Sequence, residues 1–290
     1  MTTPTGPDRT ANNYFIDTES AAEMARLLKQ ERLLTGAMGG PFPPDLDLSQ
    51  VHDVLDIACG PGGWCQEIAF EHQSIQVTGI DISMTMMRYA QVQAQVQGLD
   101  NAKFLTMDVT QPLAFPDNSF DFVNARSLIG FMQKERWPDL VREMLRVTRP
   151  GGIIRLTEFD GGGVSTSVGL ERLNKLLTLA FYKGGRGFTP IPDGQNWGIT
   201  PMLGLFVQEA GCLHVKQQAY VLDFSAGTEA NLSNYENFKV AYKLVQPFLV
   251  KMQVATQQEL DTFYNQMLAE MMQPTFRALW YYLGVWGQKP

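Results

Sequence analysis

Residues 54–63 read VLDIACGPGG. The first half is a short apolar run, typical of a strand that is buried on both faces of a parallel sheet. The second half is a turn in which Gly60, Gly62 and Gly63 let the backbone pass close to a bound molecule and then begin a helix. The segment therefore predicts a strand, a ligand-binding turn and a helix in succession.

The alternation of strand and helix continues beyond this segment. Four further strand patterns, with helical stretches between them, lie at residues 76–80, 102–107, 120–124 and 153–159. Five strands alternating with helices indicate a parallel sheet with helices on both faces. Two later strand patterns, at 213–224 and 276–285, bring the total to seven. We therefore expect an α/β fold, a doubly wound, seven-stranded, mostly parallel sheet with a helical cap.

The rest of the chain supplies the cap. A first helix is predicted next to Ser20, because Ser20 and Glu23 have the spacing of a capping box. Its apolar stripe consists of Met24, Leu27, Leu28 and Leu34. Two long cap helices are predicted at 229–252 and 256–272. The expected organisation is a tail and cap helix at 1–50, a core at 51–160, a cap insertion at 161–200, a core continuation at 201–227, a helical cap at 228–273 and a last core strand at 274–290.

Composition narrows the class of protein. The 290 residues have a net charge of −7, and 44% are hydrophobic, which suits a sizeable core and excludes wholesale disorder. The acidic balance argues against a nucleic-acid partner, which needs clustered Lys and Arg. The longest apolar run, at 278–286, is too short for a membrane span. Three Cys and no apolar signal core favour a cytoplasmic location, and no metal site is expected. Nothing in the sequence defines the oligomeric state.

Four polar sites follow the first four strands. They are Asp56 below the glycine turn, Asp81, Asp108, and Asn124 with Ala125. In an open parallel sheet, ligands bind in the crevice outside the carboxyl ends of the strands. We therefore expect these sites to converge on one ligand.

The residue types indicate which ligand this is. A carboxylate at Asp56 would repel a pyrophosphate but would pair with an ammonium group. Asp81 has the position for hydrogen bonds with ribose hydroxyls, and Asp108 can accept one from an adenine amine. An ammonium, a ribose and an adenine describe S-adenosylmethionine better than NAD. A nicotinamide-dependent oxidoreductase and a non-catalytic S-adenosylmethionine-binding module remain alternatives.

Five segments occur in a characteristic order: VLDIACGPGG at 54–63, GIDIS at 79–83, MDV at 107–109, FPDNSFDFVNA at 115–125 and RPGG at 149–152. Together they resemble the motifs of class I S-adenosylmethionine-dependent methyltransferases. The resemblance is greatest to a subgroup similar to the ubiquinone and menaquinone methyltransferases and to small-molecule methyltransferases. It covers roughly residues 51–159.

The resemblance implies a role for each matching residue. The turn at Ala58, Cys59, Gly60 and Gly62 would hold the methionine moiety, and Ala58 stands where the family has its first Gly. The other implied cofactor contacts are Asp56 at the ammonium, Asp81 at the ribose, Ile82 and Met86 against the adenine, Asp108 and Val109 at the adenine edge, Asn124 and Ala125 near the sulfonium, and Tyr14 at the carboxylate.

The resemblance implies methyl transfer to a small acceptor by in-line displacement, which leaves S-adenosyl-L-homocysteine. We expect the reaction to depend mainly on proximity, because no strong nucleophile–base pair is evident. Glu158, at the end of the fifth strand, is the candidate general base. The aromatic-rich cap suggests an apolar or aromatic acceptor. The candidate acceptor-lining residues are Arg126, Tyr182 and Trp197.

Overall fold

The computed structural model of the protein describes residues 14–17 and 19–290, so the tail predicted before Tyr14 lies outside the described residues. The described part forms one sheet of eight strands in the order β3-β2-β1-β4-β5-β8-β6, with β7 paired to β8. The strands are β1 (Asp53–Ile57), β2 (Gln76–Asp81), β3 (Ala102–Thr106), β4 (Phe120–Arg126), β5 (Thr148–Phe159), β6 (Val164–Ser165), β7 (Leu213–Asp223) and β8 (Ala278–Gln288).

The mostly parallel α/β sheet is confirmed, and the predicted number of strands is wrong by one. Strands β1 to β5 pair in parallel, whereas β8 runs antiparallel to β5. The additional strand is β6, whose two residues pair with Ala278 and Leu279 at the start of β8. Strand β7 pairs with β8 along most of its length. The carboxyl ends of the parallel strands therefore all reach one edge of the sheet.

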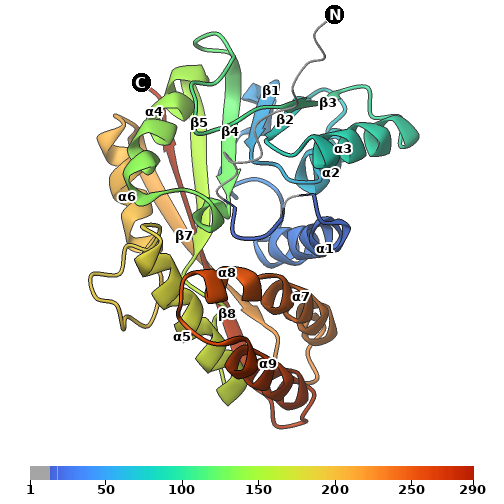
Figure 1. Cartoon of the computed structure of the whole chain (residues 1–290). Helices are drawn as coiled ribbons and strands as arrows, with labels where there is room; N and C mark the ends of the chain where they lie inside the picture. The colour runs from blue at the N-terminus through green and yellow to red at the C-terminus, as the bar shows by residue number, and fades with distance from the viewer. Residues whose placement is uncertain (1–13, 18) are drawn as a thin grey trace, which may run out of the picture.

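Helices cover both faces of the sheet (Figure 1). Helices α4 and α6 lie on one face, where the rings of Trp137 and Phe206 stack with centroids 6.0 Å apart. Helices α2 and α3 lie on the other face, and α1 lies next to α2 at the carboxyl ends of the strands. The bounds of these helices are α1 (Ala21–Ala37), α2 (Gly63–Glu71), α3 (Met84–Val96), α4 (Trp137–Val147) and α6 (Thr200–Glu209). The short 3-10 turns are η2 (Leu48–Gln50), η3 (Leu128–Gly130) and η4 (Lys134–Arg136).

Four cap helices lie beyond the carboxyl ends of the parallel strands (Figure 1). They are α5 (Val168–Lys183), α7 (Ala230–Leu244), α8 (Gln246–Lys251) and α9 (Gln257–Met271). The single helix predicted at 229–252 is divided into α7 and α8. Pro247 occupies the first turn of α8, where its missing N–H needs no partner.

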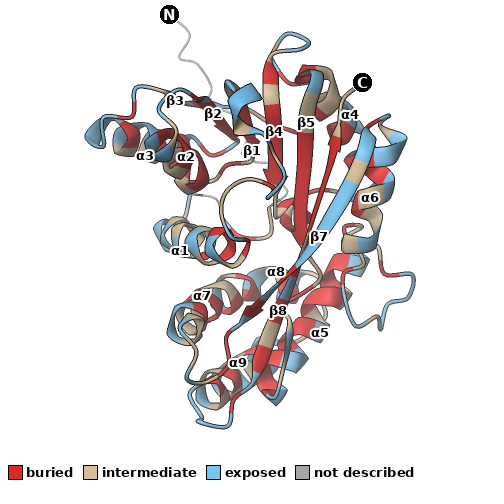
Figure 2. Ribbon diagram, turned by 180° about the vertical axis from the view of Figure 1, so that it is seen from behind, coloured by how far each residue is buried: buried red, intermediate tan, exposed pale blue. Residues whose placement is uncertain are grey.

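Burial separates the strands into two kinds (Figure 2). Strand β4 is buried on both faces, and Phe122, Val123 and Ala125 are fully inaccessible to solvent. Strand β7 is exposed along most of its length, as expected for a strand at the edge of the sheet. Among the described residues, no helix is long and apolar enough to cross a membrane.

Candidate active site

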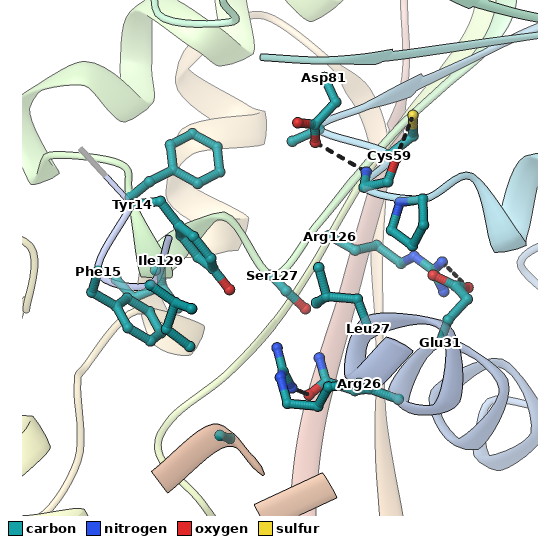
Figure 3. Close-up of a pocket in the computed structure, with 18 of the residues that line it drawn as sticks. Tyr14, Phe15, Arg26, Leu27, Glu31, Cys59, Asp81, Arg126, Ser127 and Ile129 are labelled. Atoms are coloured by element: carbon teal, nitrogen blue, oxygen red, sulfur yellow. Dashed lines mark hydrogen bonds and ion pairs between the residues drawn. The ribbon is translucent and has the colours of Figure 1, made fainter. Parts of the chain in front are cut away.

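A cavity of about 210 Å³ lies between the carboxyl ends of the strands, helix α1 and the cap helices. Figure 3 shows Asp81 across this cavity from Arg26, with Tyr14 and Phe15 closing a third side. One half of the lining consists of strand-end residues. The other half is lined by residues of α1 and by a group of aromatic side chains.

The glycine turn shapes the strand-end half. Ala58, Gly60 and Gly62 have φ values of +55°, +54° and +80°, so three residues of the turn are in the left-handed region. A Cβ added to Gly62 would lie 2.6 Å from Cε1 of Phe104, which leaves no room for a larger residue. The turn is therefore pressed against β3, and Ala58 and Gly60 line the cavity.

Two carboxylates at the ends of β2 and β3 face this cavity. The oxygens of Asp81 accept hydrogen bonds from the backbone N–H groups of Gly60 (3.0 Å) and Ser83 (2.9 Å). Burial raises the pKa of Asp81, and these two donors oppose that effect. Asp108 is held by the backbone and the hydroxyl of Thr110, at 2.9 and 2.7 Å. Both carboxylates are thus oriented before any ligand arrives, and each keeps lone pairs for further hydrogen bonds.

Asp56 lies deeper, at the end of β1. Its Oδ1 accepts a hydrogen bond of 2.7 Å from Nδ2 of Asn124, whose Oδ1 in turn accepts one of 2.8 Å from Nε of Arg155. Burial raises the pKa of Asp56 to about 7, although the positive charge of Arg126 acts in the opposite direction. Asp56 lines the cavity, as do the predicted residues Tyr14, Ala58, Cys59, Gly60, Asp81, Ile82, Met86, Asp108 and Val109.

Three of the predicted cofactor contacts do not line the cavity: Asn124, Ala125 and Gly62. Asn124 is fully buried and orients Asp56 instead. Ala125 follows Asn124 on β4, and its side chain faces the opposite side of the sheet because side chains alternate along a strand. Gly62 acts as the residue that lets the turn approach Phe104.

Glu158 is not placed as a base for a ligand in the cavity. It neighbours Phe159 on β5, and Phe159 lines the cavity, so strand alternation directs Glu158 to the opposite face. Its Oε1 accepts the N–H of Leu128 at 2.5 Å, and burial raises its pKa well above the ordinary value. Its position supports a structural role, holding the turn η3 whose residues Ile129 and Gly130 line the cavity.

Helix α1 contributes a polar wall that was not predicted from the sequence. Ser20 caps the helix through the N–H of Glu23, but the Glu23 side chain turns inward instead of completing a capping box. The buried residues of the helix are Glu23, Arg26, Gln30, Leu34 and Thr35, so only Leu34 of the predicted apolar stripe is buried.

These buried polar groups form one connected network. Arg26 makes two bonds of 2.7 Å with Glu23 and donates to Gln30 (2.6 Å) and to Asn237 of α7 (2.9 Å). Tyr14, predicted to donate to a cofactor carboxylate, donates to Glu23 at 2.8 Å. The network therefore joins the N-terminal segment, α1 and the cap on one side of the cavity.

Of the three predicted acceptor-lining residues, Arg126 and Trp197 line the cavity. Arg126 forms an ion pair with Glu31 of α1 and donates to the hydroxyl of Thr35 at 3.2 Å. Tyr182 does not line the cavity, because it lies on the outer side of α5 with 38% of its surface exposed. The prediction for Tyr182 thus falls on a side chain that the structure places outside this cavity.

Five aromatic rings form a continuous surface in the cap half, which we call the aromatic wall: Trp197, Phe159, Trp280, Phe238 and Tyr242. Successive ring centroids in this order are 5.3, 5.0, 5.1 and 5.4 Å apart. Phe159 and Trp280 come from neighbouring core strands, and neither was among the residues predicted for the site. Phe159 could have been found, because it ends a predicted strand at the ligand-binding edge.

No cluster of three or more His, Cys, Asp or Glu side chains that could hold a metal occurs within residues 14–17 and 19–290. The three Cys are buried and free. Cys59 and Cys65 flank the glycine turn, and burial raises the pKa of both thiols. These thiols therefore behave as small apolar side chains at neutral pH.

Comparison with known proteins identifies the core. Residues 54–152 match a family described as a methyltransferase domain. Over 103 residues the chain is 34% identical to demethylmenaquinone methyltransferase of Geobacillus stearothermophilus, covering 34% of this chain and 42% of the relative. Over 114 residues it is 34% identical to ajmaline N-methyltransferase of Rauvolfia serpentina, covering 39% and 38%. The matches thus span less than half of these relatives.

Solved structures extend the likeness of the fold to most of the chain. The YcgJ protein of Bacillus subtilis has a TM-score of 0.51 at 18% identity and covers 83% of this chain and 93% of its own. Phosphoethanolamine N-methyltransferase 2 of Haemonchus contortus, in complex with S-adenosyl-L-methionine, has a TM-score of 0.53 at 17% identity, covering 94% and 57%. The predicted resemblance to class I S-adenosylmethionine-dependent methyltransferases is therefore confirmed, and residues 54–152 match the methyltransferase-domain family.

Proposed function

We propose that this protein is an S-adenosylmethionine-dependent methyltransferase whose acceptor is a small, largely apolar or aromatic molecule. The observation that carries the proposal is a single cavity that joins three strand-end carboxylates, Asp56, Asp81 and Asp108, to the aromatic wall. The first group suits a polar cofactor that carries an ammonium, a ribose and an adenine. The second suits an apolar acceptor placed next to it.

The donor and acceptor groups of the strand-end half fit S-adenosylmethionine. Asp81 is fixed by Gly60 and Ser83 and has oxygen lone pairs left for ribose hydroxyls. Asp108 can accept from the adenine amine, and Ile82 and Met86 supply apolar contacts for the ring. Asp56, held by Asn124, would pair with the cofactor's ammonium group. The other residues proposed for this site are Tyr14, Ala58, Cys59, Gly60 and Val109.

The cofactor would supply a methyl group bound to a positively charged sulfur, and it would leave as S-adenosyl-L-homocysteine. The chain's own residues would then hold donor and acceptor in line and exclude water. Such positioning lowers a barrier by roughly 7–11 kcal/mol without any acid or base. This accords with the position of Glu158, which faces away from the cavity. The names of the curated relatives, demethylmenaquinone methyltransferase and ajmaline N-methyltransferase, are those of enzymes for small molecules.

Ligand-binding measurements test the cofactor assignment. Thermal unfolding should show stabilisation by S-adenosylmethionine and S-adenosylhomocysteine but not by NAD or NADH. Calorimetric titration of Asp81→Asn should give a dissociation constant for S-adenosylhomocysteine at least about tenfold higher, because a hydrogen bond to a charged group is lost. Asp100→Asn, at an exposed site, is the matched control and should bind normally. Stabilisation by NADH alone would refute the proposal.

Turnover separates an enzyme from a module that only binds the cofactor. The protein is incubated with S-adenosylmethionine and a broad panel of small apolar acceptors, and release of S-adenosylhomocysteine is followed by mass spectrometry. We expect release that depends on the acceptor. Cofactor binding without turnover of any acceptor would favour the non-catalytic alternative.

A further inference from the structure

We propose that the methyl acceptor is a hydrophobic amine, bound with its nitrogen against the aromatic wall. This inference rests on the proposed function and names the substrate class of the same cavity. It follows from three properties of the lining: the pairing of its cations, the position of its carboxylates and the arrangement of its aromatic rings.

The two cations in the lining are already neutralised. Arg26 is bound by both oxygens of Glu23, and Arg126 is ion-paired with Glu31. Among the described lining residues there is no Lys and no His. A phenolate, thiolate or carboxylate acceptor would therefore enter this cavity without an unpaired protein cation, and burying such a charge is costly.

Removal of a proton by the protein is equally unsupported. The carboxylates of the described lining are Glu31, Asp56, Asp81 and Asp108. Glu31 is bound to Arg126, and the three Asp side chains belong to the strand-end half, where they are held by other groups. A neutral alcohol would find no carboxylate on the aromatic wall to take its proton. A neutral amine needs none, because its nitrogen already carries a free lone pair.

The aromatic wall suits the charge that an amine acquires. As the nitrogen lone pair forms the new carbon–nitrogen bond, the carbon–sulfur bond breaks and its electron pair stays on sulfur. The positive charge thereby moves from sulfur to nitrogen, and a secondary or tertiary ammonium product then releases a proton to water. Aromatic faces attract such a cation, most strongly where water is excluded. Phe159 supplies the centre of this surface, with its ring centroid 5.3 Å from that of Trp197 and 5.0 Å from that of Trp280.

A matched series of inert probes tests the cavity without relying on turnover. Benzyltrimethylammonium, its uncharged carbon isostere neopentylbenzene, and phenylacetate are titrated into the protein saturated with S-adenosylhomocysteine, which has a neutral sulfur. We expect the ammonium to have a dissociation constant about fivefold or more below that of neopentylbenzene, and phenylacetate to bind most weakly. Replacing S-adenosylhomocysteine by S-adenosylmethionine should weaken binding of the ammonium probe, because the positive sulfonium and the positive ammonium are then neighbours.

Variants test whether the preference for the ammonium over neopentylbenzene depends on the aromatic wall. Trp197→Leu and Phe238→Leu should bring the ratio between ammonium and isostere towards one, while the affinity for S-adenosylhomocysteine stays within about twofold. Tyr182→Leu, which removes an aromatic ring outside the cavity, should keep the wild-type ratio. Far-UV circular dichroism checks that each variant is folded. If a variant does not fold, the ratio of the two dissociation constants measured with the wild-type protein still decides the question.

The outcomes distinguish this inference from the proposed function. Preferred binding of phenylacetate, or equal binding of the ammonium and neopentylbenzene, overturns the inference even if the cofactor binds. Absence of cofactor binding overturns the proposed function, and the probe series without cofactor then still reports on the wall. In turnover, N-methylbenzylamine should be methylated at least about tenfold faster than benzyl alcohol or phenylacetate, since neither oxygen nucleophile gains a base or a cation. Faster methylation of either oxygen compound would also overturn the inference.

Discussion

Ala58 offers a prediction whose magnitude can be worked from the backbone. It occupies the first position of the glycine turn with φ of +55°, where an L-residue with a Cβ is strained by about 1–2 kcal/mol. Replacing it by Gly removes the strain, but it also gives the unfolded chain more freedom, at a cost of about 0.4–1 kcal/mol. The Ala58→Gly variant should therefore unfold with a free energy about 0.5–1 kcal/mol higher than wild type.

Urea unfolding and calorimetric titration measure both consequences. A gain of this size corresponds to a rise in the unfolding temperature of about 2 °C for a chain of this length. Affinity for S-adenosylhomocysteine should be equal or higher, because the methyl group of Ala58 lines the cavity. Gln253→Gly is the control, since Gln253 has φ of +52° in an exposed turn and should give a similar gain without any effect on binding. A less stable Ala58→Gly protein would refute the reasoning about strain.

Three further predictions concern the turn and the buried carboxylates. Because the pKa of Asp56 is raised to about 7, lowering the pH from about 8 to about 6 should protonate it and weaken S-adenosylmethionine binding about tenfold in calorimetric titrations, and Asp56→Asn should remove this dependence. Gly62→Ala should lower the unfolding free energy in urea by about 2–4 kcal/mol, because its Cβ meets Phe104, whereas Gly98→Ala, with similar φ and open space, should lose about 1 kcal/mol. Glu158→Gln should keep its methylation rate within about threefold, while a general base would cost about 10²–10⁴-fold. Burial raises the pKa of Glu158, so wild type should lose stability as the pH rises above the ordinary pKa of a Glu side chain, and the variant should lose less.

The sequence was sufficient to predict the core and its ligand-binding edge. Short apolar runs and a glycine turn are local signals, and parallel strands necessarily bring their carboxyl ends to one edge. Asp56, Asp81 and Asp108 could therefore be placed in one cavity without knowledge of the tertiary structure. The two-residue strand β6 could not be predicted, because its pairing depends entirely on the distant start of β8.

The orientation of Glu158 could not be predicted, for a different reason. The end of β5 was predicted correctly, but the choice between two adjacent residues depends on which face of the sheet meets the cavity. Phe159 faces the cavity and Glu158 faces η3, and only the register between β4 and β5 decides this. The polar character of a residue at a strand end is thus a weak indicator of a site. A better indicator is the face on which its side chain lies, counted by alternation from a neighbour of known orientation.

Helix α1 could not be oriented from its own sequence, and the physical reason bears on function. Its apolar residues Leu27 and Leu28 approach the glycine turn and α2, while Arg26 donates directly to Asn237 of α7. Burying Arg26 is tolerable only because Glu23, Gln30 and Asn237 satisfy its donors, and Asn237 lies 211 residues away in the chain. A stripe of Leu and Met side chains therefore indicates one packed face but does not exclude a second, polar one. In this protein the polar face neutralises a cation at the wall of the proposed acceptor site, and that neutrality is what favours an uncharged acceptor.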